Sequence, residues 1–212
     1  DNRLRMMVRG REKISGTGRV LIGNILSGSL ETNDLIQFWA RPTEMVYQAT
    51  TKTIEIFHER RDRVSTGSIV GVHAKDPETA IYWNRWNPQQ PKFLATKQTE
   101  QQFVGRCLGF RALMKLTKAN TSLKKGVRLT ITVNMQIVVC ELRTILSRKH
   151  NGKSRPNTSI MTGDLAVVEL SPEGLLHVEV EKNCPKLSRL TLWNGREILG
   201  AGKVLGLNRT IC

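Results

Sequence analysis

Short stretches of β-branched and apolar residues recur along the whole chain, and glycine, asparagine, aspartate or proline interrupts them at intervals of about ten residues. None of these stretches keeps the apolar period of about 3.6 residues that an amphipathic helix shows. The pattern predicts strands at residues 3–8, 17–25, 34–39, 51–57, 68–72, 103–116, 127–132, 136–146, 165–170, 175–180, 188–193 and 197–207. Because long helices are missing from this pattern, we expect an all-β fold made of two consecutive antiparallel β-barrels.

The segment from residue 82 to residue 91 departs from this pattern, since it contains two prolines and three aromatic residues without alternation. We therefore expect a first barrel over residues 1–89, a linker over residues 90–101 and a second barrel over residues 102–212. Tyr82, Trp83 and Trp86 could stack on nucleic-acid bases or could pin one domain on the other. The sequence leaves both roles open.

The composition is that of a globular protein, with 39% hydrophobic and 24% charged residues among 212. It excludes a collagen-like or wholly disordered chain. The apolar runs at residues 138–140 and 165–168 are far shorter than the roughly 18–20 residues that a membrane-spanning helix needs. With no signal peptide at the start we expect a cytoplasmic protein, and the absence of an initiator methionine suggests a piece of a longer one.

The positive charge is concentrated in one segment of the chain. The formal net charge is +15, and residues 97–155 hold thirteen basic residues against Glu100 and Glu141. A local basic surface of this density is typical of a polyanion partner, most simply nucleic acid, because each neutralised phosphate releases counterions. A solubilising surface is the alternative interpretation.

Basic side chains at strand ends and loop tips are the candidates for phosphate contact, since a long side chain can reach a nucleic-acid backbone without a rigid pocket. Residues 148–155 are expected to form the basic tip of a hairpin between two strands. The candidate binding residues are Lys115, Lys118, Lys124, Lys125, Arg128, Arg148, Lys149, Lys153, Arg155 and Arg189.

No catalytic or cofactor site is indicated. Gly152-Lys153-Ser154 has the ending of a Walker phosphate loop, but Ser147 stands where that motif needs glycine and Pro156 prevents a following helix. The histidines have no partners at metal-ligand spacing, and the cysteines form no C-x-x-C pair. These residues are His58, His73, His150 and His177, and Cys107, Cys140, Cys184 and Cys212.

Residues 16–30 carry a glycine pattern that resembles the opening of the second domain of translational GTPases of the elongation factor Tu and elongation factor one-alpha superfamily. The slots of that pattern are filled in register by Gly16, Gly18, Val20, Gly23, Ile25, Gly28 and Leu30. Residues 52–59 and 65–72 are similar to a later block of the same domain. Residues 110–112, 162–170, 188–193 and 198–204 are similar to strands of the third domain, so the resemblance covers nearly the whole chain.

Several positions depart from the family pattern. An arginine is replaced by Asn24 and an acid by Ser68, a glycine and a phenylalanine by Ser188 and Leu190, and an Arg-Asp pair by Trp193-Asn194. The glycines that shape the barrels persist while exposed polar positions have changed. This suggests an intact fold with altered ligand contacts.

The resemblance implies a two-barrel, carboxyl-terminal portion of a translational GTPase that binds the ribosome and either tRNA or a tRNA-mimicking release or rescue factor. It also implies that this portion is not itself an enzyme and holds no cofactor, since GTP and magnesium would belong to an amino-terminal GTPase domain in cis. Residues 54–59 are closer to the elongation factors, whereas the span from residue 140 to 152 and Arg155-Pro156 are more similar to the termination and rescue group. The alternative is a free-standing basic β-barrel protein that binds RNA or is a structural part of the ribosome.

Overall fold

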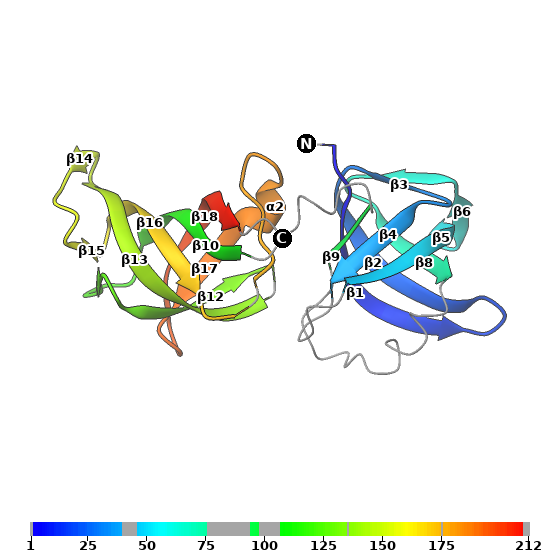
Figure 1. The fold of residues 1–212 in the computed structure, drawn as a ribbon, viewed down its shortest axis with the longest axis horizontal. Coiled ribbons are helices and arrows are strands. Elements are labelled where there is room, and N and C mark those ends of the chain that lie inside the picture. Colours follow the sequence, from blue (N-terminus) through cyan, green and yellow to red (C-terminus); the bar gives the residue numbers. More distant parts are fainter. Residues whose placement is uncertain are drawn as a thin grey trace. The chain divides into compact units, whose positions relative to one another are not determined.

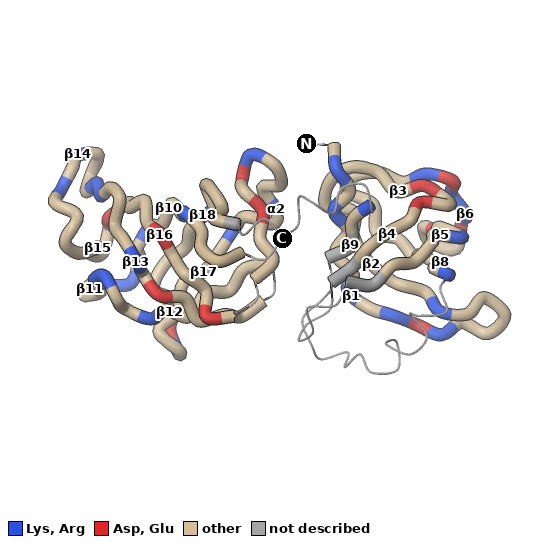
Figure 2. Tube along the Cα trace, viewed as in Figure 1, with Lys and Arg blue, Asp and Glu red and all other residues tan. Residues whose placement is uncertain are grey.

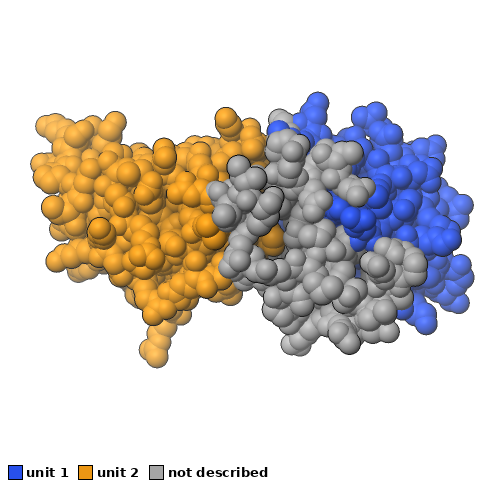
Figure 3. All heavy atoms as spheres, viewed as in Figure 1, with its two compact units in different colours: residues 1–103 blue, residues 104–212 orange. Residues whose placement is uncertain are grey.

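The computed structural model describes residues 2–39, 46–75, 94–97, 107–134, 136–174 and 176–209. The chain divides into two compact units, Asp1–Phe103 and Val104–Cys212, which Figure 3 colours separately. Both units are built almost entirely from antiparallel strands, as Figure 1 shows. The expected all-β class with two antiparallel barrels is confirmed.

In the first unit, six strands pair in the order β4-β9-β1-β2-β8-β5, and the pairing of β4 with β5 closes the ring. Strand β6 extends the sheet beyond β5, while β3 and β7 form a separate two-stranded ladder. The strands are β1 (Arg5–Ile14), β2 (Gly18–Ser27), β3 (Ser29–Glu31), β4 (Leu35–Trp39), β5 (Val46–Ile56), β6 (Glu59–Arg61), β7 (Arg63–Ser65), β8 (Ile69–Lys75) and β9 (Leu94–Lys97).

Strand β9 consists of residues for which the sequence pattern predicts a linker. It pairs with β1 through Met6↔Ala95 and with β4 through Gln37↔Thr96, and Thr96 is fully buried. A strand of four residues is too short to show a recognisable alternation in the sequence. Tyr82, Trp83 and Trp86 lie outside the described residues.

In the second unit, six strands pair in the order β12-β17-β18-β10-β16-β13, and the pairing of β12 with β13 closes the ring. Strand β14 extends the sheet beyond β13, and β11 pairs with β15. The elements are β10 (Cys107–Leu116), β11 (Ser122–Lys124), β12 (Arg128–Val133), β13 (Gln136–His150), β14 (Lys153–Ser154), β15 (Ser159–Met161), β16 (Leu165–Pro172), α2 (Pro185–Ser188), β17 (Arg189–Trp193) and β18 (Ile198–Arg209). Within the described ranges no helix is long and apolar enough to cross a membrane.

Alternation along the strands separates each hydrophobic core from the outer surface. On β10, Phe110, Ala112 and Met114 are buried, whereas Arg111 and Lys115 are exposed. Neighbouring residues of a strand point to opposite faces, so the period of two that builds the core also directs these basic side chains outward. Each unit has its own buried apolar cluster, which satisfies the expectation of two cores.

The strand that the pattern predicts at residues 175–180 is wrong, because residues 176–180 have an irregular backbone. Gln136 Nε2 donates to the carbonyl of His177 (2.7 Å), and the His177 N–H donates to Gln136 Oε1 (3.1 Å). Asn134 Nδ2 donates to the carbonyl of Leu187 (2.8 Å). Side-chain amides thus take the place of a neighbouring strand, and the apolar alternation reflects burial of Leu176 and Val178 in a loop.

Gly28 explains why the opening motif of the first barrel contains glycine. Its φ is +69°, and a Cβ at this position would lie 2.5 Å from the carbonyl carbon of Arg3. A side chain here would both strain the backbone and collide with the start of the chain. Gly28 therefore permits both the positive φ and the close approach of the backbone at Arg3.

Candidate nucleic-acid interface

The turn Thr162-Gly163-Asp164 joins several segments of the second barrel. Thr162 Oγ1 donates to the carbonyl of Lys118 (2.6 Å) and accepts from the Thr121 N–H (3.1 Å), while the Gly163 N–H donates to the carbonyl of Leu116 (2.9 Å). These bonds bring the connection after β10 beside the turn. We call the end of the barrel formed by residues 115–125, 148–155 and 162–164 the basic end.

Asp164 lies fully buried at the centre of the basic end. Its Oδ2 accepts from the Met161 N–H (2.6 Å) and from Arg148 Nε (2.5 Å), and its Oδ1 lies 2.8 Å from His150 Nδ1. The Arg148 side chain is only 11% exposed. Arg148 therefore serves mainly as the counter-ion of Asp164, and its guanidinium has little surface left for a phosphate.

Burial by itself would raise the pKa of Asp164. The hydrogen bonds from Met161, His150 and Arg148, together with the positive charge of Arg148, outweigh this effect and hold the pKa below its ordinary value. The carboxylate is thus charged at neutral pH and forms a true ion pair with Arg148.

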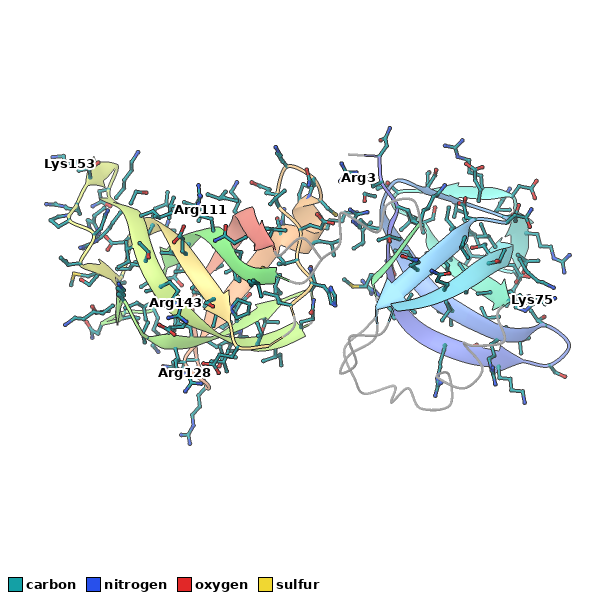
Figure 4. All side chains as sticks on the ribbon, viewed as in Figure 1. Arg3, Lys75, Arg111, Arg128, Arg143 and Lys153 are labelled. Atoms are coloured by element: carbon teal, nitrogen blue, oxygen red, sulfur yellow. The ribbon has the colours of Figure 1, made fainter. Side chains whose placement is uncertain are left out.

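The basic hairpin predicted at residues 148–155 is confirmed. Lys149 pairs with Ser154 and His150 with Lys153, while Asn151 and Gly152 both have positive φ, as a tight two-residue hairpin turn requires. Lys153 projects from the tip of this hairpin in Figure 4. Gly152-Lys153-Ser154 is therefore part of a strand-to-strand turn, and it does not fit the strand-to-helix geometry of a nucleotide-binding loop.

Two lysines stand on the same outer rung of the barrel wall. Lys115 on β10 and Lys149 on β13 both pair with Leu165 on the intervening strand β16. Directly paired residues share a face, so the two lysine side chains flank Leu165 with Cα atoms about 10 Å apart. This spacing suits contact with separate phosphates of one nucleic-acid backbone.

The ten candidate residues differ in whether a carboxylate already neutralises them. Lys118 is paired with Glu197 (2.7 Å), Arg128 with Glu173 (2.5 Å) and Arg148 with Asp164. Seven other candidates are exposed and make no ion pair among the described residues. They are Lys115, Lys124, Lys125, Lys149, Lys153 and Arg155 at the basic end, and Arg189 elsewhere. Most of them lie in the blue segments around β11, β13 and β14 in Figure 2.

Two candidates lie away from the basic end. Arg128 begins β12, and its bond to Glu173 holds the pKa of that carboxyl below its ordinary value. Arg189 begins β17 and pairs across the sheet with Lys203, which itself binds Glu181 (2.5 Å). Arg189 and Lys203 line an open groove on the outer wall that continues to Lys115.

Arginines of the first barrel show a different arrangement. At the edge formed by β5, β6 and β7, each arginine has an acidic neighbour, so the charges largely cancel. The pairs are Arg60–Glu55 (3.9 Å), Arg61–Glu59 and Arg63–Glu31 (3.4 Å).

Metal-ligating side chains are not clustered in the described part of the chain. No group of three potential metal ligands occurs there. Cys107, Cys140 and Cys184 are buried, and burial raises the pKa of Cys140 to about 12. A thiol with so high a pKa is a packing group rather than a nucleophile.

The contact that sequence reasoning missed is the cluster of Asp164 with Arg148 and His150. Thr162-Gly163-Asp164 is part of the family resemblance, but its partners come from a strand about fifteen residues earlier in the chain. Only the register of β13 against β16 brings them together.

Comparisons with known proteins bear on this fold and this basic end. Residues 109–205 match the family model described as GTP-eEF1A C-terminal domain-like. Elongation factor 1-alpha of Entamoeba histolytica is 26% identical over 96% of this chain and 45% of its own length. The same factor of Thermococcus onnurineus is 24% identical over 99% of this chain and 49% of its own length.

The chain is similar to the carboxyl-terminal portion of translational GTPases. The resemblance seen in the sequence is thereby confirmed. The chain spans about half the length of the curated proteins it matches. A crystal structure of Sup35 complexed with GDP superposes with a TM-score of 0.75 at 16% identity, covering 97% of this chain and 48% of that one, which shows the shared fold.

Proposed function

We propose that this chain is the RNA-facing part of a translational GTPase in the cytoplasm, and that it binds tRNA, or a protein factor that mimics tRNA, on the ribosome. This part of the protein binds and positions its ligand and catalyses no reaction. GTP hydrolysis would belong to a GTPase domain acting in cis. The branch of the family, elongation, termination or ribosome rescue, stays open.

One observation carries the proposal: six exposed basic side chains that make no ion pair with any described residue gather at the basic end of the second barrel. Unneutralised lysines and arginines gain most from phosphates, because binding releases the counterions condensed on RNA. They are fixed on a rigid barrel, so the site does not have to be ordered first. The similarity to elongation factor 1-alpha supports a translational role for such a site.

Charge reversal of Lys124, Lys149 and Lys153 to glutamate tests the proposal. These three residues are exposed, unpaired and located on different strands of the basic end. We expect binding of unfractionated tRNA at about 100 mM salt to weaken by more than about tenfold, and the salt slope to fall by about two to three. Fluorescence anisotropy with labelled tRNA over a salt series measures both quantities.

A second triple variant, Lys52→Glu, Lys182→Glu and Lys186→Glu, provides the matched control. It makes the same change in net charge at exposed positions that are not part of the basic end. Lys52 lies on β5 of the first unit, and Lys182 and Lys186 lie near helix α2 at the other end of the second barrel in Figure 1. We expect less than about a threefold loss, since screened charges beyond about 10 Å contribute little. Equal losses in the two variants would refute a defined site.

A comparison of RNA types separates the proposal from the free-standing RNA-binding alternative. Folded tRNA should bind at least several-fold more tightly than poly(U), because the basic end has no Phe, Tyr or Trp on which a single strand could stack, and the His150 ring is bonded to Asp164. Equal binding of tRNA and poly(U) would favour the alternative.

A further inference from the structure

We infer that Asp164 is a positioning residue of the basic end: it orders the β13–β14 hairpin and so presents Lys149, Lys153 and Arg155 to RNA phosphates. The inference rests on the proposed function and deepens it, because it assigns a role in binding a polyanion to a negatively charged side chain. It can be separated from the proposed function by experiment, as described below.

The backbone ladder to β16 reaches only as far as Arg148↔Ala166 and Lys149↔Leu165, and beyond it the hairpin has little else to hold it. Residues 151–158 are all exposed, and the ladder between its arms at the tip consists of the pairs Lys149↔Ser154 and His150↔Lys153. Among the described residues, the side-chain hydrogen bonds from residues 148–158 to the barrel outside β13 all end on the Asp164 carboxylate. An exposed two-stranded hairpin is only marginally stable without such support.

Asp164 can provide this support because it is itself immobile. It is fully buried, and it accepts the N–H of Met161 within its own turn. The preceding strand β15 is anchored in the core by Ile160, which has no exposed surface. The carboxylate is thus a fixed point of the barrel.

Arg148 transmits this fixation to both arms of the hairpin. Its Nε donates to Asp164, its Nη1 donates to the carbonyl of Pro156 (3.4 Å), and its own carbonyl accepts from the Arg155 N–H (3.0 Å). The imidazole of His150 adds a second bond to the same carboxylate, and it packs above Gly163, where a Cβ would lie 3.2 Å from His150 Cε1. The outgoing and returning strands are therefore both tied to one carboxylate.

Because side chains alternate along β13, neighbouring residues of this strand have different roles. Arg148 and His150 face Asp164, so Lys149 between them faces the outer wall, on the rung that it shares with Lys115. The bonds that fix the Arg148 and His150 side chains therefore also fix the direction in which Lys149 points. A ligand that meets an ordered cation loses less conformational entropy than one that must order it.

The sign of one binding change tests the inference. Asp164→Asn keeps the shape of the side chain and removes one negative charge, so electrostatics alone predicts tighter binding of tRNA. If Asp164 positions the hairpin, binding weakens instead, by about 3- to 10-fold, and the salt slope falls by about one to two as hairpin contacts are lost. Binding as tight as wild type, or tighter, by a folded variant would overturn the inference.

The single variant could fail to fold because it leaves Arg148 without a counter-charge. A double variant that keeps the net charge unchanged, Asp164→Asn with Arg148→Met, avoids this problem. It removes both partners, so no unpaired charge is left in the barrel wall. We again expect weaker binding of tRNA, whereas charge alone predicts no change. The matched control is Asp34→Asn with Lys97→Met, which removes the corresponding pair of the first barrel (2.9 Å) and should leave affinity within twofold.

Amide hydrogen exchange supplies a readout that does not depend on RNA. In both Asp164 variants the amides of residues 149–155 should exchange faster, while those of β10 and β16 stay protected. Unchanged exchange in the hairpin would overturn the inference even if binding falls. If wild-type protein fails to bind tRNA at any salt concentration, the proposed function is refuted, and the exchange data still decide whether Asp164 orders the hairpin.

Discussion

Residues 29–35 of the first barrel and residues 159–165 of the second barrel form matching turns. Their sequences are Ser-Leu-Glu-Thr-Asn-Asp-Leu and Ser-Ile-Met-Thr-Gly-Asp-Leu. The Glu31 N–H donates to Asp34 Oδ2 (2.7 Å) as the Met161 N–H donates to Asp164 Oδ2 (2.6 Å). Asn33 and Gly163 both have positive φ, at 70° and 85°.

The two aspartates differ in burial and in their partners. The side chain of Asp34 is 21% exposed and pairs with Lys97, whereas Asp164 is fully buried and holds Arg148 and His150. One local turn thus serves two purposes: in the first barrel it closes a strand connection, and in the second it also anchors a hairpin. The surroundings, rather than the turn itself, decide how much the aspartate contributes.

The largest expected difference between the turns is in stability. Asp164→Asn should lower the free energy of unfolding of the second barrel by about 3 kcal/mol, because Arg148 would be left nearly buried without a counter-charge. Asp34→Asn should cost less than about 1 kcal/mol, since its partly exposed pair is screened by water. Native-state hydrogen exchange, which measures each barrel separately, checks both values, and equal costs would contradict the comparison.

Low pH should reduce the stability that Asp164 contributes to the second barrel. The folded-state pKa of Asp164 lies below its ordinary value, so the stability that the charged group contributes is present above about pH 3.9 and is lost as the pH falls through the folded-state pKa. We expect the difference in unfolding free energy between wild type and Asp164→Asn to stay constant down to about pH 5. It should narrow as the pH falls further, through the folded-state pKa of Asp164, which lies below about 3.9. Urea denaturation of the two proteins from about pH 6 to about pH 3 measures this difference, and a difference that stays constant throughout would show that the charge of Asp164 does not matter.

Substitution of the residues at positive φ, Gly163 and Asn33, should have the smallest effect on the free energy of unfolding. Gly163→Asn should cost about 1 kcal/mol, because its Cβ would crowd His150, whereas Asn33→Gly should stay within about 0.5 kcal/mol. Thermal unfolding of the two single variants gives the difference. If Gly163→Asn were as well tolerated as Asn33→Gly, the packing of His150 on the turn would be unimportant.

Much of the fold could be predicted from the sequence because strand alternation and turn residues are local signals. The hairpin at residues 148–155 was predictable for this reason. The irregular course of residues 176–180 was not, since it depends on amide side chains of Asn134 and Gln136 about forty residues away.

The candidate site was predictable in charge but not in pairing. Residue counts identify the basic segment, yet they do not show that Lys118, Arg128 and Arg148 each meet a carboxylate. Those partners are set by register and loop geometry, which sequence spacing does not contain. Whether the exposed residues bind RNA stays a prediction.

The pairing of strand β18 determines when the second barrel can close during synthesis of the chain. This strand pairs along nearly its whole length with β10, the first strand of the same unit, from Cys107↔Arg209 to Leu116↔Gly200. Synthesis begins at the amino terminus, so β10 is made well before β18. One edge of β10 therefore stays without a partner strand until the last dozen residues of the ring have been made. A chain truncated before residue 198 would keep that side open for good, as a template for association with other chains.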